Sequence, residues 1–355
     1  MFGNNPEALR PYLEILLTGF VTFVIAMVLT PAWTNILYKY KLGKQIREGN
    51  TPIFTKMHKD KKGTPTMGGV LIWGSVLIVA VLGLALAKLF PGSAFLHGFN
   101  FLTRSQTWLP LFALIAAALI GLVDDYMNIK KIGPLGGGLR MRHRIILYLL
   151  VAAIGALWFY FKLNWDVIHV PGIGDFSLGI WYIPFFILVI VATSHSTNIT
   201  DGLDGLAGGV LLAAFGVFGV IAFVQHHVDL AALCAAIIGA LLAFLWFNIH
   251  PARFFMGDTG SMALGTTLGI VAMLTNSALV LPVVGFVFVL ESGSVLIQVV
   301  SKKVFGRKVF LSTPLHHHFE AKGWPETKVT MRFWIIAAVC GVLGLIVGLI
   351  GRGNS

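Results

Sequence analysis

The sequence predicts an all-α polytopic integral membrane protein with ten transmembrane helices, and three observations support this fold class. First, 57% of the 355 residues are apolar (AVILMFWYC), only 12% are charged, and the mean hydropathy is +0.84. A soluble domain carries about 45–50% apolar and about 25% charged residues, so this chain has too little charge to cover a soluble surface. Second, the apolar residues gather in ten long runs. Third, the basic residues gather in alternate loops between these runs.

Composition also excludes several other classes of protein. The two cysteines, Cys234 and Cys340, lie within apolar runs, where they predict core packing and no disulfide framework. The hydrophobicity excludes a disordered chain. The net charge of +11 does not predict nucleic-acid binding, because the positive side chains lie in short loops between apolar runs. We therefore expect no nucleic-acid partner.

Ten stretches are long and apolar enough to span a membrane, which takes about 20 residues. They are residues 13–38, 67–90, 108–123, 145–162, 180–197, 205–225, 230–247, 259–275, 278–300 and 331–350. The first stretch is too long for a cleaved signal peptide, and Arg10 is the only basic residue before it. We expect residues 1–355 to form a single membrane domain.

The distribution of Lys and Arg predicts which loops are cytoplasmic. Of the 26 Lys and Arg residues, 20 lie in the alternate loops 39–66, 124–144, 198–204, 248–258 and 301–330, and five lie on the other side. Membrane proteins keep such basic loops in the cytoplasm. This pattern predicts that both termini face the outside.

Aspartates follow the same asymmetry, because five of them lie in these cytoplasmic loops or at the helix ends beside them. They are Asp124, Asp125, Asp201, Asp204 and Asp258. Loop 198–204 has no Lys or Arg, so its acids have no local base to pair with. Three separate loops thus bring carboxylates to one membrane face, which predicts an active site on the cytoplasmic side.

The adjacent Asp124 and Asp125 end the third predicted span. Neighbouring side chains on a helix diverge by about 100°, so the helix must end or unwind there if both serve one site. A merely solvated helix end is the alternative, but the C-terminus of a helix disfavours anions.

The segment 198–206 combines acids with glycines. Asn198, Asp201 and Asp204 recur every three residues and would share one face of a helix, while Gly202 and Gly205 let a ligand approach the backbone. Free N–H groups where the next span begins favour an anion. Mg²⁺ would bridge such carboxylates to an anionic phosphate. The alternative interpretation is Asx capping with glycine packing.

Two further segments carry candidate residues. Asp258 occupies the expected N-cap position of the eighth span, where a simple cap is the alternative, and Phe254 and Phe255 beside it suit either ring stacking or membrane-interface anchoring. The run 61–69 combines lysines, hydroxyls and glycines, which suits phosphate contact but also marks a cytoplasmic boundary.

Three consecutive histidines, His316, His317 and His318, follow Pro314. They lack the i, i+4 spacing of a zinc-binding helix, and we expect them in a loop outside the core. Histidines suit hydrogen bonding to phosphate or acid–base work near neutral pH, whereas an exposed cluster without function is the alternative. Glu291 lies inside the ninth span, where an ionisable group indicates a functional site, and Pro282 would kink that span.

Five of these runs together resemble a known family. They are KGTPTMGG (62–69), LVDDY (122–126), NITDGLDGLA (198–207), FMGDTGS (255–261) and TPLHHHFEAKGWPE (313–326). They resemble, in order and over nearly the whole chain, the polyprenyl-phosphate N-acetylhexosamine-1-phosphate transferases. The histidine run with GWPE and the Arg332-Phe333-Trp334 triplet resembles one branch, the phospho-N-acetylmuramoyl-pentapeptide transferase (MraY) family.

The resemblance implies a step of peptidoglycan synthesis in the bacterial cytoplasmic (inner) membrane. Phospho-MurNAc-pentapeptide passes from UDP-MurNAc-pentapeptide to undecaprenyl phosphate, a membrane lipid, giving lipid I and UMP. It further implies Mg²⁺ and a homodimer. As catalytic residues it implies Asp124, Asp125, Asp258, His316, His317 and His318, with Asp258 and Asp201 holding the metal. The substrate-binding residues it implies are Lys61, Thr66, Asn198, Asp201, Gly202, Leu203, Asp204, Asn248, Phe255 and Gln298.

Within that resemblance, Asp124 is the residue proposed to deprotonate the lipid phosphate, and Asp204 and Phe255 would hold uracil. One loop departs from the family. Asn128 stands where members often carry a lysine and Gly136–Gly138 crowd a second basic position, so Lys130 or Lys131 would have to substitute.

The residues and the resemblance agree on phosphoryl transfer, which needs mainly positioning and charge neutralisation. A phosphate monoester is largely ionised at cytoplasmic pH, which favours direct attack and leaves a covalent aspartyl intermediate open. One rival is a sister transferase using UDP-GlcNAc, which should lack the histidine run. The other is a transporter, but transporters place polar groups near the bilayer midplane in repeated halves, and no internal repeat is visible.

Together these inferences predict one cytoplasmic cleft. In it Asp124 or Asp125, Asp201 and Asp258 would share a hydrated ion, since Mg²⁺–oxygen distances are about 2.0–2.1 Å. The histidine segment 313–320 would form one wall, and Phe255 with residues 202–204 the nucleoside end.

Overall fold

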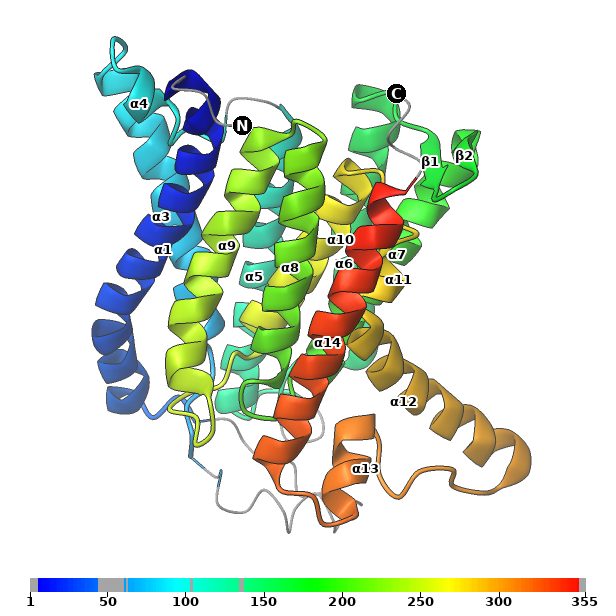
Figure 1. Cartoon of the computed structure of the whole chain (residues 1–355). Helices are drawn as coiled ribbons and strands as arrows, with labels where there is room; N and C mark the ends of the chain where they lie inside the picture. Colours follow the sequence, from blue (N-terminus) through cyan, green and yellow to red (C-terminus); the bar gives the residue numbers. More distant parts are fainter. Residues whose placement is uncertain (1–5, 44–60, 62, 103–104, 134–136, 351–355) are drawn as a thin grey trace.

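A computed structural model describes residues 6–43, 61, 63–102, 105–133 and 137–350 (Figure 1). The described chain is helical apart from one short hairpin. The elements are α1 (Pro6–Lys39), α3 (Gly69–Leu89), α4 (Ala94–His97), α5 (Ser105–Ile129), α6 (Met141–Leu157), a π-helical turn (Trp158–Lys162), β1 (Val167–Val170), β2 (Gly174–Ser177), a 3-10 turn (Gly179–Trp181), α7 (Tyr182–Thr200), α8 (Leu206–Val224), α9 (Val228–Asn248), α10 (Asp258–Leu274), α11 (Leu281–Val284), α12 (Phe286–Phe305), α13 (Leu315–Ala321) and α14 (Glu326–Leu349).

Eight helices in the described ranges are long and apolar enough to cross a membrane. They are α1, α3, α5, α6 with its π-helical turn, α7, α8, α9 and α14. The chain is therefore a multi-pass membrane protein, as the composition predicts. The other two predicted spans, 259–275 and 278–300, are not among the eight.

Helix α10 corresponds to the predicted span 259–275, but it has only 17 residues. Every residue of α10 after Asp258 is buried, and the helix packs against α3, α5, α7 and α8. The predicted span 278–300 is divided at Gly285 into α11 and α12, and Pro282 lies in the first turn of α11. Helix α12 is polar at several positions, carries Lys302 and Lys303 in its last turn, and extends away from the bundle (Figure 1).

The two ends of the bundle differ in what they carry (Figure 1). The start of α1 and the end of α14 lie at the same end, together with α4 and the β1–β2 hairpin, whereas α13 lies at the opposite end. The described ends of the chain, in α1 and α14, therefore lie at the same end of the bundle. The hairpin itself was not predicted from the sequence, although its strands flank a Pro-Gly turn at residues 171–172.

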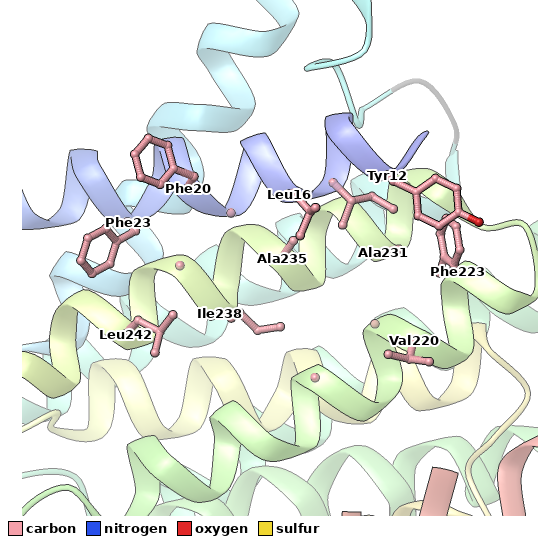
Figure 2. Close-up of a pocket in the computed structure, with 15 residues that line it drawn as sticks. Tyr12, Leu16, Phe20, Phe23, Val220, Phe223, Ala231, Ala235, Ile238 and Leu242 are labelled. Atoms are coloured by element: carbon pink, nitrogen blue, oxygen red, sulfur yellow. The ribbon is translucent and has the colours of Figure 1, made fainter. Parts of the chain in front are cut away.

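An apolar pocket of about 600 Å³ lies between α1, α8 and α9 (Figure 2). Its lining includes Leu16, Phe20, Phe23, Val220 and Leu242, and it contains no charged side chain. Phosphoryl transfer needs charged or strongly polar groups at the reacting phosphates. This pocket therefore offers no chemistry for the predicted reaction, and the candidate site lies elsewhere.

Helices α1 and α9 approach one another closely at two glycines. A Cβ atom on Gly239 would overlap the carbonyl oxygen of Gly19, and a Cβ on Gly19 would come within 3.0 Å of the carbonyl oxygen of Ala235. Small residues allow this backbone contact, which is the usual basis of helix association in membranes.

We predict that Gly239→Ala destabilises the protein, by about 1–3 kcal/mol, because the new methyl group forces α1 away from α9. Gly216→Ala is the matched control: Gly216 lies on α8, and nothing lies within 4 Å of where its Cβ would be. Thermal unfolding in detergent measures both. Equal melting temperatures for the two variants would show that the helices tolerate a wider separation.

Candidate active site

The start of α10 is the centre of the candidate site. The chain reaches Asp258 through Gly257, whose φ of +75° is a conformation that favours glycine. A Cβ on Gly257 would lie 2.5 Å from Oδ2 of Asp125 and 2.6 Å from the hydroxyl oxygen of Thr66. Only glycine fits between these two side chains, so Gly257 allows α5 and the backbone around Thr66 to pack closely against the start of α10.

Asp125 caps α10 from another helix. Its Oδ1 accepts a hydrogen bond from the backbone N–H of Asp258 (3.2 Å), and its Oδ2 accepts one from Thr259 (3.1 Å). The first N–H groups of a helix have no partner within it, and Asp125 satisfies two of them. The N-cap expected for Asp258 is therefore wrong: Asp258 is the first helical residue, and its side chain is available for other contacts.

Helix α5 does not end or unwind at the aspartate pair but continues to Ile129, beyond the predicted boundary at residue 123. Asp124 and Asp125 consequently point in different directions. The Asp124 carboxylate accepts hydrogen bonds from Nη2 of Arg144 and from the backbone N–H of Leu139. Both aspartates nevertheless reach the start of α10, because Arg144 connects Asp124 to the Asp258 side chain.

Arg144 is the cation between the two acids. Its Nη2 contacts Asp124 and also lies 3.1 Å from Oδ2 of Asp258, so one guanidinium nitrogen serves both carboxylates. In the sequence, Arg144 is one of several basic residues of the loop 124–144, and nothing there marks it as a site residue. Lys130, one of the two expected substitutes for the missing loop lysine, lies over the ring of Tyr126 instead, with 5.9 Å from Nζ to the ring centroid.

Asn198 completes this group from α7. Its Nδ2 donates to Oδ1 of Asp258 (2.8 Å) and to the hydroxyl oxygen of Ser261 (3.0 Å). The expected helical face shared by Asn198, Asp201 and Asp204 is wrong, because α7 ends at Thr200. Asp201 follows directly after this end and is half-buried, while Asp204 turns to a different set of partners.

Asp204 belongs to a second, neighbouring network of charges. Its Oδ1 accepts from Nζ of Lys61 (2.7 Å), and its Oδ2 lies 3.0 Å from Nδ1 of His250 and accepts from the backbone N–H of Ala252 (3.1 Å). Glu326, at the start of α14, accepts from the same Lys61 and from the backbone N–H of Asp204 (2.7 Å). His250 was not singled out from the sequence, and Glu326 was noted only as the last residue of the GWPE run.

Two places in the described chain therefore deserve comparison as metal sites. Asp204, His250 and Glu326 offer ligand atoms within 4.8 Å of one another, and the Lys61 ammonium lies on both carboxylates, just as Arg144 lies on Asp124 and Asp258. Asp124 and Asp258 offer carboxylate oxygens only, both within reach of one cationic nitrogen. Mg²⁺ prefers one or two carboxylates and disfavours histidine nitrogen. The Asp124–Asp258 pair fits Mg²⁺ better.

The segments around Thr66 and Phe255 pair through their backbones. Phe255 donates to the carbonyl of Pro65 and accepts from the N–H of Gly68, each at 2.8 Å. This pairing leaves the half-buried ring of Phe255 5.7 Å from Nζ of Lys61. Phe254 is neither a stacking platform nor an interface anchor, because it is fully buried.

Two predicted substrate-binding amides lie against backbone groups. Asn248 accepts from the N–H of Gly205 (3.0 Å) and donates to the carbonyl of Phe254 (2.8 Å). Gln298 accepts from the N–H groups of Val309 and Phe310 (2.9 and 3.0 Å) and donates to the Phe310 carbonyl (3.0 Å). Both amides hold loops in place. Leu203 is buried and Thr66 is buried beside Gly257.

The histidine run does not lie in a loop, so that expectation is wrong: residues 315–321 form α13, and both His316 and His317 are buried. Each buried ring has a carboxylate partner, which offsets the cost of removing it from water. Nδ1 of His316 lies 2.9 Å from Glu291, and Nδ1 of His317 lies 2.7 Å from Glu320.

His318 differs from its two neighbours because it remains partly exposed. Burial, and then the nearby positive charge of Lys322, lowers the pKa of His318 below its ordinary value. Its Nδ1 accepts a hydrogen bond from the backbone N–H of Leu311 (3.2 Å), which requires the unprotonated nitrogen. The geometry and the direction of the pKa shift agree that His318 is neutral near pH 7.

Comparisons with known proteins identify the family. Residues 61–72 match phospho-N-acetylmuramoyl-pentapeptide-transferase signature 1, and residues 107–276 match glycosyl transferase family 4. A phospho-N-acetylmuramoyl-pentapeptide-transferase of Chloroflexus aurantiacus is 37% identical over 348 residues, covering 94% of this chain and 89% of the relative. The chain belongs to the phospho-N-acetylmuramoyl-pentapeptide-transferase family. Relatives of the same name from Geobacillus sp. (strain WCH70) and Bacillus thuringiensis (strain Al Hakam) are each 38% identical, covering 92% and 94% of this chain and 95% and 98% of the relatives.

The two matched regions contain most of the residues that surround the start of α10. The transferase signature at residues 61–72 contains Lys61 and Thr66, and the longer match contains Asp124, Arg144 and Asp258. Residues 313–326, which carry the histidines and Glu326, lie beyond both matches but within the coverage of the full-length relatives.

We predict that Asp125→Ala lowers the free energy of unfolding by about 1 kcal/mol, because α10 loses its N-terminal cap. Asp125→Asn keeps one carbonyl oxygen as an acceptor and should lose less. Thermal unfolding of both variants, alongside transfer activity, tests this. An Asp125→Ala protein as stable as the wild type but inactive would assign Asp125 to chemistry and not to capping.

Proposed function

We propose that this protein transfers phospho-MurNAc-pentapeptide from UDP-MurNAc-pentapeptide to undecaprenyl phosphate in the bacterial cytoplasmic membrane, producing lipid I and UMP. One observation carries the proposal: α5, α6 and α7 bring Asp124, Arg144 and Asn198 to Asp258 at the buried start of α10. Acidic and basic side chains thus gather at one end of an apolar bundle. This arrangement suits a reaction between two phosphorylated substrates, one of which is a lipid.

Asp124 and Asp258 would hold Mg²⁺, and Asp201, the residue directly after the end of α7, would be a further ligand. Bound there, the ion would neutralise charge on the diphosphate and stabilise the departing UMP. Arg144 keeps the two carboxylates together, Asn198 orients Asp258, and Asp125 fixes the helix that carries Asp258. These contacts pre-position the acids so that little reorganisation is needed when the substrates bind.

An oxygen of undecaprenyl phosphate attacks the phosphorus attached to the sugar, and the bond from that phosphorus to the oxygen of UMP breaks. The attacking phosphate is already ionised at cytoplasmic pH, so direct attack needs no strong base. Asp124 receives two hydrogen bonds from Arg144 and Leu139, which favours a role in holding charge over one in removing a proton.

Lys61, Asp204 and Phe255 would form the nucleoside end of the cleft. The half-buried Phe255 ring offers a flat surface for a base, and Lys61 lies between that ring and the Asp204 carboxylate. The buried His316 lies against Gly202 in the turn between Asp201 and Asp204, so α13 borders the same cleft.

The same proposal includes the membrane arrangement. We propose that α10 and the α11–α12 pair complete ten spans, that both termini face the outside and that the cleft faces the cytoplasm. We also propose a single membrane domain and a homodimer, as the family resemblance implies. Helix α13 and the last turn of α12, which carries Lys302 and Lys303, lie toward the end of the bundle opposite the start of α1 and the end of α14 (Figure 1).

Release of UMP by the purified protein tests the proposed reaction. Detergent-solubilised enzyme with Mg²⁺ and undecaprenyl phosphate should release UMP from UDP-MurNAc-pentapeptide and not from UDP-GlcNAc. Release from UDP-GlcNAc alone would identify the sister activity instead. Absence of release from either nucleotide, with lipid and metal present, would contradict the proposal.

Asp258→Ala should abolish UMP release while leaving thermal stability near that of the wild type, because Asp124 still neutralises Arg144. Binding of Mn²⁺, used as a spectroscopic substitute for Mg²⁺, should weaken at least tenfold. Asp175→Ala is the control, since Asp175 is an exposed carboxylate on the distant hairpin. Near wild-type turnover by the Asp258 variant would remove this residue from the metal site.

Arg144→Gln should lower stability when Mg²⁺ is absent, because Asp124 and Asp258 then repel each other across the start of α10. Added Mg²⁺ should raise the melting temperature of this variant more than that of the wild type, since the ion replaces the missing cation. Identical shifts in the two proteins would mean that Mg²⁺ does not bind between these carboxylates.

A further inference from the structure

Glu291 is a fully buried acid on α12, and neither it nor its partner His316 has any exposed surface. A carboxylate removed from water is costly unless it is paired and hydrogen-bonded. The partner that pairs with Glu291 is His316, which lies on α13 and not on α12. The pair therefore connects α12, which leaves the bundle, to the helix that carries the histidines (Figure 1).

Two hydrogen bonds from one residue fix this contact. The backbone N–H of His316 donates to Oε1 of Glu291 (3.2 Å), and Nδ1 of its ring lies 2.9 Å from Oε2. An ionised Glu291 carboxylate can only accept a hydrogen bond. The proton shared between the two side chains therefore belongs to Nδ1 of His316. Glu291 therefore sets both the position of the His316 backbone and the rotation of its ring.

The other ring nitrogen, Nε2, is held at a defined place. It is buried and has no hydrogen-bond partner among the described residues. It faces Gly202, where an added Cβ would overlap it. A buried polar atom without a partner is destabilising, and this cost is recovered only when a polar group reaches Nε2.

We propose that Glu291 is a positioning residue for transfer: it holds His316 so that Nε2 faces the Asp201–Asp204 turn, where it contacts a polar group of the bound sugar nucleotide. The inference rests on the proposed function, because it needs that substrate in the cleft. The arrangement is a carboxylate–histidine pair in which the acid orients the ring, as such pairs do at metal and catalytic sites.

The neighbouring pair of His317 and Glu320 shows why Glu291 is distinctive. Those two residues are three apart on the same short helix, so their contact is local to α13. Glu291 instead reaches His316 from another helix across 25 residues of sequence. The Glu291 contact therefore joins the histidine helix to α12.

Glu291→Gln is the first test, since it keeps the size of the side chain and removes its charge. We expect kcat to fall about 10- to 100-fold, the usual effect of losing an orienting carboxylate, with KM for undecaprenyl phosphate unchanged. Glu14→Gln is the matched control: it makes the same chemical change at the far end of α1. A Glu291 variant with wild-type kcat would overturn the proposal.

A second variant reaches the same ring from the opposite side and does not depend on α12. Gly202→Ala should displace Nε2 and lower kcat by a similar factor. In a His316→Ala background, neither Glu291→Gln nor Gly202→Ala should cause a further loss, because both act through His316. Full additional losses in that background would show that these residues act independently of the ring.

A measurement without substrate separates this inference from the proposed reaction. In protein labelled with ¹⁵N-histidine, the His316 signal, assigned by its loss in His316→Ala, should report a proton on Nδ1 that Glu291→Gln perturbs and Glu14→Gln does not. That signature together with an inactive wild type would refute the proposed reaction and leave the pairing intact. An unperturbed His316 signal in Glu291→Gln would refute the positioning role, whether or not the enzyme transfers.

Discussion

The site depends on the way in which α10 begins inside the bundle. A buried helix start leaves N–H groups that water cannot reach, and Asp125 supplies the acceptors for two of them from α5. This cap frees the Asp258 side chain to meet Asn198 and Arg144. Residues 259–274 of α10 are all buried, so the neighbouring helices fix the position of α10 on every side. Asp258, the first residue of this helix, is thereby held in place.

Pairing of buried charges organises the remaining residues around that helix. Arg144 pairs with Asp124 and Asp258, Lys61 pairs with Asp204 and Glu326, and His316 pairs with Glu291. Each pair joins segments that are distant in sequence, because an unpaired charge in a low-dielectric interior costs more than the ordering of a loop. The charges that suit the substrates thereby also hold the cleft together.

The irregular parts of the membrane bundle carry or contact residues of the candidate site. Helix α10 is too short to match a typical span, α11 and α12 break at Gly285, and α12 departs from the bundle while carrying Glu291 and Gln298. Non-helical backbone at membrane depth is tolerated where protein covers it, and here α14 and α7 pack against the α11–α12 region. A regular ten-helix bundle would not bring α13 to the turn at Gly202.

The sequence by itself determined the class of the protein, the family and most of the site's members, because hydropathy, basic loops and short polar motifs are local signals. Asp124, Asp258 and Asn198 were all predicted, and the structure brings them together. Only the tertiary structure decided that Asp125 caps α10, that Arg144 joins the two acids, and that the histidines form a buried helix paired with Glu291 and Glu320. Each of these depends on which distant partner satisfies a buried charge or N–H group, and no local pattern encodes that choice.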